Sequence, residues 1–212
     1  FAGAGVAMVG SRQALFAEIS PDMSSVDEVA AVLPRIEAQR ADLELWRDEA
    51  IEHITASVSA AFSTSESKAW MLSGLQDIRV RDTFLWDVAQ PGADRPSAIA
   101  SLTGVLRSAP EGYVAPVATV LAIQHWSSGD GARANACLDR AADDDPNYSL
   151  AALANTAISN GLPPTTWQDM MGALDRDKCR QGLTSATSKS PSSLAASTPA
   201  VSFPQTSPGL AG

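Results

Sequence analysis

The chain contains few of the residues that carry metal and nucleophilic chemistry. Its 212 residues include only two cysteines and two histidines, too few for a disulfide framework in a domain of this size. It also has no G-x-S-x-G, H-E-x-x-H or Walker pattern. We therefore expect no catalytic residue, no metal and no cofactor, and a reduced, cytoplasmic setting.

The chain also lacks long apolar runs and an excess of positive charge. No stretch of 18 apolar residues occurs, so no transmembrane helix is predicted. Lysine and arginine number 15 against 24 acidic residues, which gives a net charge of −9. An acidic surface repels both a nucleic-acid backbone and an anionic bilayer. We accordingly expect neither nucleic acid nor a membrane as a partner.

The two ends of the chain differ from its middle. The first residue is Phe1 rather than methionine, which suggests the edge of a longer polypeptide. From residue 184 the composition changes to serine, threonine, alanine and proline, with Lys189 as the only charge. Such a segment cannot bury enough apolar area to offset the entropy of ordering. We predict a helical domain over 1–183 and a disordered tail over 184–212.

The segments between these ends predict helices. Ser25 with Glu28, and Thr165 with Gln168, have the spacing of a capping box, and Ser97 is a third candidate cap. An amphipathic helix is predicted around residues 36–58, where apolar residues recur at helical spacing. Further helices are predicted at 77–89 and 149–159. The apolar positions assigned to one face of the longest helix are Ile36, Leu43, Trp46, Ala50, Ile51, Ile54 and Val58.

Residues 118–148 give the strongest fold signal. They predict one helix, a tight turn at Gly129, Asp130 and Gly131, and a second helix stopped by Pro146. The small and apolar positions match the pattern of a tetratricopeptide-type repeat. These matching packing positions are Leu121, Ala122, Ala134, Leu138 and Ala141. The pattern concerns packing alone and specifies no chemistry.

Together these signals predict an all-α fold of about seven to nine helices. The helices should pack as antiparallel helical hairpins, with the tetratricopeptide-like pair near the C-terminal end.

Four segments resemble a known family when taken in order: GSRQAL near the start, IRVRD in the middle, the run APVATVLAIQHWSSGDGARANACLDRAADDDPNYSLA, and GLPPTTW. Over residues 3–180 the chain resembles the C-terminal half of an actinobacterial family of domains of unknown function, number four-one-nine-two in that series. The resemblance implies a bacterial cytoplasmic origin and a helical C-terminal half that follows an α/β half. It implies no activity, since the family has none established.

The IRVRD segment holds the candidate site. Asp77 and Arg81 are spaced i, i+4, and Arg79 and Asp82 are spaced i, i+3, so both pairs are expected to form on a helix surface. An arginine turned inward could hold a carboxylate or phosphate with its planar fork. The alternative is structural, with an arginine that ties neighbouring helices together. We take Arg79, Arg81 and Asp82 as candidate ligand or partner residues.

Other polar residues have simpler interpretations. The acidic run at 143–145 is expected to be a solvated loop, and His125 a packed or half-exposed side chain. Cys137 should lie on the inner face of its helix and Cys179 should be exposed. Glu49 and His53 share a helix face, but no third ligand lies at a suitable spacing for zinc.

Three functions are compatible with the sequence. The first is a non-catalytic interaction or regulatory module that binds an unidentified protein partner through a surface of stacked helices. The second is part of an enzyme or ligand-binding protein whose main site lies in a missing N-terminal half, with Arg79 or Arg81 contacting an anionic group. The third is an acidic mimic of nucleic acid. The sequence does not indicate an oligomeric state.

Overall fold

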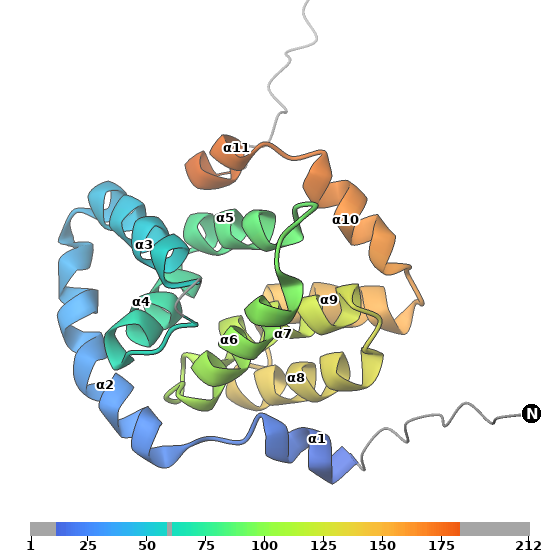
Figure 1. The fold of residues 1–212 in the computed structure, drawn as a ribbon, viewed down its shortest axis with the longest axis horizontal. Helices are drawn as coiled ribbons and strands as arrows, with labels where there is room; N and C mark the ends of the chain where they lie inside the picture. The colour runs from blue at the N-terminus through green and yellow to red at the C-terminus, as the bar shows by residue number, and fades with distance from the viewer. Residues whose placement is uncertain (1–11, 59–60, 183–212) are drawn as a thin grey trace, which may run out of the picture.

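A computed structural model describes residues 12–58 and 61–182 (Figure 1). This part of the chain contains eleven α-helices, one short 3-10 helix and no strand. The all-α prediction is confirmed, with more helices than the seven to nine expected. The tail predicted at 184–212 lies outside the described residues, as does Phe1.

In the first half of the fold, α2, α3 and α5 pack around α4. Here α3 packs against both α4 and α5, and α2 packs along α4. The helices are α1 Arg12–Glu18, α2 Met23–Glu37, the 3-10 helix η1 Ala38–Ala41, α3 Leu43–Val58, α4 Ser65–Leu75 and α5 Ile78–Ala89.

The second half is organised around α7. Every residue of this helix from Val114 to Trp126 is buried, because α4, α6, α8, α9 and α10 all pack against it. A helix that is apolar on all sides is typical of a protein core. The helices are α6 Arg95–Arg107, α7 Val114–Ser127, α8 Gly131–Asp144, α9 Ser149–Ser159, α10 Pro164–Gly172 and α11 Arg176–Gln181.

The predicted hairpin is formed by α7 and α8, which pack more extensively than any other pair of described helices. Gly129 adopts a φ of +82°, a conformation that glycine reaches without strain. Asp130 caps α8, since its carboxylate accepts a hydrogen bond of 3.0 Å from the Arg133 backbone amide. Pro146 follows the end of α8, as expected.

The two ends of the described chain cover opposite sides of this core. α1 packs against α8, and α11 packs against α5 (Figure 1). Segments far apart in sequence therefore meet: Arg12 bonds to Asp139 at 2.7 Å, and Trp86 donates from Nε1 to the carbonyl of Leu174 at 3.0 Å.

The three predicted caps were wrong, each by two or three residues. Asp22 caps α2 and Asp94 caps α6, by accepting from the backbone amides of Ser25 and Ser97. Asp is as good a cap as Ser, so the earlier aspartate begins each helix. Pro163 precedes α10 without any side-chain cap, so Thr165 lies inside that helix.

The long amphipathic helix predicted around 36–58 is in fact two elements. α2 continues through Pro34 to Glu37, so Ile36 belongs to α2, and α3 begins at Leu43 after η1. Leu43 is 40% exposed, whereas Trp46, Ala50 and Ile54 are buried as predicted. The apolar residues keep helical spacing across η1, so their pattern did not reveal the boundary between α2 and α3.

Candidate functional site: the polar network of α5

The candidate segment begins with Asp77, which caps α5. Its Oδ1 accepts from the backbone amides of Arg79 at 2.9 Å and Val80 at 3.4 Å. These amides would otherwise lack partners at the helix start. The backbone of α5 therefore holds the Asp77 carboxylate in position without help from any other side chain.

The partner of Asp77 is Arg47 on α3, rather than the predicted Arg81. The Arg47 Nε and Nη2 atoms each lie 2.9 Å from Asp77 Oδ2. Both side chains are nearly buried, with exposed fractions of 6% for Asp77 and 14% for Arg47. Burial raises the pKa of Asp77, but the hydrogen bonds from Arg47 and the backbone amides outweigh it and lower the pKa overall.

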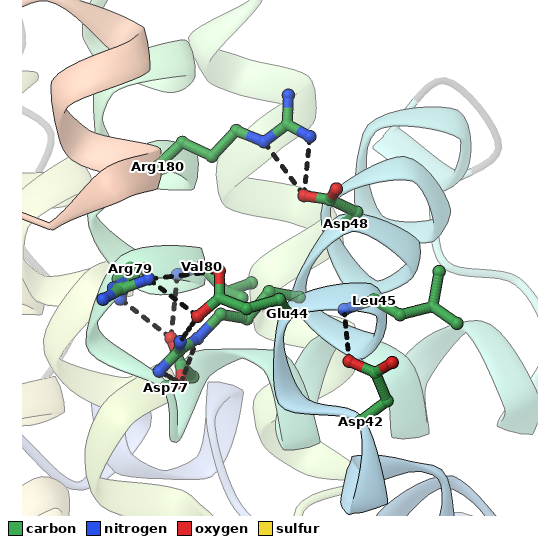
Figure 2. A network of polar contacts seen from close by, with 9 residues as sticks. Asp42, Glu44, Leu45, Asp48, Asp77, Arg79, Val80 and Arg180 are labelled. Carbon is green, nitrogen blue, oxygen red and sulfur yellow. Dashed lines mark hydrogen bonds and ion pairs between the residues drawn. The ribbon is translucent and has the colours of Figure 1, made fainter.

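Arg79 reaches outward from α5 to Glu44 on α3, rather than to the predicted partner Asp82. Its Nη1 lies 3.0 Å from Glu44 Oε1, and Arg47 Nη1 donates to the same oxygen at 2.6 Å. Figure 2 shows the side chains of Glu44, Asp77 and Arg79 converging between the two helices. This outer part of the network is open to solvent, because Glu44 is 74% exposed.

Arg81 is the inward arginine of the segment. Its Nε and Nη2 donate to Asp82 at 2.9 and 2.8 Å, and its Nη1 donates to the hydroxyl of Tyr148 at 3.1 Å. Only 11% of the Arg81 side chain is exposed. Tyr148 lies in the connection between α8 and α9, so Arg81 links α5 to the far end of the repeat-like hairpin.

The polar network consists of hydrogen bonds and ion pairs that connect neighbouring helices. Asp77 and Arg79 join α5 to α3, and Arg81 joins α5 to the α8–α9 connection. Next to this network, Arg180 of α11 donates to Asp48 of α3 at 2.6 Å (Figure 2). Arg47, Arg79, Arg81 and Arg180 each already have a carboxylate partner, so binding an external anion would require the loss of an internal bond.

Sequence spacing could not identify Arg47, Glu44 or Tyr148 as members of this network. Each lies at least 30 residues from its partner on α5 or its cap. Local i, i+3 and i, i+4 rules describe neighbours on a single helix. Contacts between helices depend on how the helices pack, which the spacing does not encode.

The hairpin turn carries a second cluster. Arg133 donates to Glu18 of α1 through Nε and Nη2 at 2.8 and 3.0 Å, and to Asp130 at 2.6 Å. His125 lies close by and is 7% exposed, and burial lowers its pKa. The turn residues thus hold α1 against the hairpin, in addition to reversing the chain.

Asp144 has a structural role that the sequence did not indicate. Its carboxylate accepts from the backbone amides of Gly112 at 2.7 Å and Ala115 at 2.8 Å. These amides lie at the N-terminal end of α7, where negative charge is favourable. The run at 143–145 is therefore not simply a solvated loop, because its middle residue stabilises the start of the central helix.

The two cysteines are both free and buried. Cys137 lies on the inner face of α8 as predicted, and burial raises the pKa of its thiol to about 12. The prediction that Cys179 is exposed was wrong, because α11 folds back on α5 and covers it. A raised pKa leaves a thiol protonated and poorly reactive.

Within residues 12–58 and 61–182, no cluster of three or more histidine, cysteine or acidic side chains has the arrangement of a metal site. His53 stacks on Trp70, with ring centroids 4.4 Å apart. None of the described helices is both long enough and apolar enough to cross a bilayer.

These features define the chain as an all-α domain built around a central helical hairpin, with a hydrophobic core and ion pairs between its helices. The family model described as Domain of unknown function (DUF4192) matches residues 1–165. The chain therefore belongs to the DUF4192 family, which confirms the resemblance found in the sequence. No curated protein and no solved structure matches it.

Proposed function

We propose that this domain is a non-catalytic interaction module that binds a protein partner. The supporting observation is the exposure of three large apolar side chains in the α9–α10 region: Leu153 is 68% exposed, Leu162 44% and Met170 56%. Large apolar side chains left in contact with water are candidate contact points for a partner.

The packing of α9 and α10 supports this assignment. α9 uses Ala151 and Ala154 to pack against the rest of the fold, so Leu153 is not needed for the core. α10 packs against α5 and α7 through its buried Met171, whereas the adjacent Met170 is exposed. Figure 1 shows α10 at the edge of the molecule. A partner can therefore reach these side chains without any rearrangement of the helices.

The alternative, an anion site at Arg79 and Arg81 within a larger enzyme, gains no support from the geometry. Arg79 is paired with Glu44 and Arg81 with Asp82. Reduced, cytoplasmic conditions remain part of the proposal, because they would keep Cys137 and Cys179 as thiols. The acidic composition favours a partner that tolerates or complements negative charge.

The proposal is tested by affinity capture from native lysate with the full 212-residue chain as bait. A Leu153→Glu/Met170→Glu variant should lose at least about 90% of a partner held by this surface, since charges placed in an apolar contact cost about 2 kcal/mol or more. Leu45→Glu is the matched control, because Leu45 is 57% exposed on α3. Equal recovery with all three baits would reject the α9–α10 surface as the contact.

A further inference from the structure

A groove separate from the polar network lies between α3, α5, α6 and the start of α11. Its volume is about 850 Å³, within the range of small-molecule sites. We propose that it binds a small, uncharged and largely apolar molecule that carries one hydrogen-bonding group, such as a ketone or an alcohol. This ligand site is distinct from the α9–α10 surface and does not depend on it.

The walls of the groove supply the apolar part of the recognition. They include Val58 at the end of α3, Phe84 and Val88 on α5, and Ala98 on α6. Three of these, Phe84, Val88 and Ala98, belong to the hydrophobic core. The groove is therefore an opening onto core side chains, which favours an apolar occupant.

The charged residues of the groove are already bonded to other groups. Arg176 binds Asp87 through two hydrogen bonds of 2.7 and 2.9 Å. Asp94 accepts from the backbone amide of Ser97 at 3.1 Å and from its hydroxyl at 2.7 Å. A charged ligand would have to disrupt one of these arrangements, whereas an uncharged ligand leaves them intact.

Ser101 supplies the polar part of the recognition. It lines the groove but is only 3% exposed, so it lies at the base. Its hydroxyl has no hydrogen-bond partner among the residues that the structure describes. Two nearby hydroxyls, those of Thr103 and Ser108, bond to the carbonyls four residues earlier, at 2.8 and 3.0 Å. The Ser101 hydroxyl is covered as well as unpartnered, so a ligand that enters the groove bonds to it by displacing the side chains that cover it.

The test uses prodan, a neutral naphthyl ketone whose fluorescence shifts to the blue in apolar surroundings, titrated into the full chain. We expect saturable binding. Ser101→Ala keeps the apolar wall and should weaken binding about fivefold, the loss typical of one hydrogen bond. Ala100→Phe fills the mouth of the groove from an exposed position and should abolish binding. Ala152→Phe places the same side chain at an exposed position on α9 and should bind as the unmodified chain does.

Three results would overturn the proposal. The first is the absence of saturable prodan binding to the unmodified chain. The second is equal binding by the Ala100→Phe and Ala152→Phe variants, which would place the probe elsewhere. The third is competition by the anionic dye anilinonaphthalene sulfonate at the same affinity, which would show that the groove does not select an uncharged ligand. Thermal unfolding of each variant without the probe confirms that it is folded.

Discussion

Arg47 and Asp77 form the most deeply buried ion pair between α3 and α5, with Arg47 Nε 2.9 Å from Asp77 Oδ2. Asp77 at the same time caps α5. One carboxylate therefore begins a helix and fixes its neighbour, so the candidate segment is tied into the fold at its first residue.

Removal of Arg47 should be strongly destabilising. In Arg47→Met the apolar stem is retained, but Asp77 is left as a buried charge with only backbone donors. We expect the free energy of unfolding to fall by about 3 kcal/mol, measured by urea denaturation. Arg180→Met is the matched control: its pair with Asp48 is about half exposed, so its loss should change stability by less than about 1 kcal/mol. Equal effects would contradict the burial argument.

The Arg47–Asp77 ion pair also predicts that the free energy of unfolding depends on pH. Because the pKa of Asp77 is lowered from 3.8 in the folded state, the unfolded chain takes up a proton first as the pH falls. The stabilisation from ionised Asp77 is thus fully present above the unfolded value and is lost as the pH falls below about 4 through the folded pKa. The stability difference between the unmodified chain and Asp77→Asn should therefore shrink from pH 6 to pH 3, by chemical denaturation. If this stability difference stayed constant from pH 6 to pH 3, protonation of Asp77 would not be coupled to unfolding.

Asp144 should stabilise the start of α7 more than its neighbour in the same acidic run. Asp144→Ala removes the acceptor of two backbone amides, at Gly112 and Ala115. We expect a loss of about 1 to 2 kcal/mol. Asp143→Ala removes the same charge from an exposed position and should change stability by about 0.5 kcal/mol or less. A solvated acidic loop would instead give the same small effect for both variants.

Two helical glycines should respond in opposite directions to alanine. A Cβ at Gly74 would lie 2.7 Å from Ile54 Cδ1 and 3.0 Å from Val80 Cγ1, whereas a Cβ at Gly104 meets nothing within 4 Å. Gly74→Ala should destabilise the fold by about 1 to 3 kcal/mol through overpacking. Gly104→Ala should stabilise it by about 0.5 to 1 kcal/mol through helix propensity. Thermal melting of the two variants would show shifts of opposite sign.

The sequence alone predicted an element correctly where its bounds depend on residues within one helix or turn. The helix at 149–159 has the predicted bounds, and the helix predicted at 77–89 differs by one residue from α5, Ile78–Ala89. Periodicity and turn residues act locally, so a pattern of neighbours is enough to locate these elements.

The sequence alone did not predict which side chains bond to or cover one another when these side chains come from different helices. Asp77 has a local candidate in Arg81, yet packing brings Arg47 closer, and Arg81 turns to Tyr148. Cys179 is in a charged stretch that predicts exposure, yet α11 folds onto α5. The groove around Ser101 has no sequence signal, because residues from four helices line it.

The most direct test of the account is to compare two variants in the same affinity-capture experiment. Arg79→Ala removes an arginine of the candidate segment whose partner Glu44 is largely exposed, and Leu153→Glu/Met170→Glu changes the α9–α10 surface. We predict that Arg79→Ala recovers the partner at the level of the unmodified chain and that the α9–α10 variant does not. Recovery by the α9–α10 variant together with loss in Arg79→Ala would contradict the account and assign binding to the α5 network.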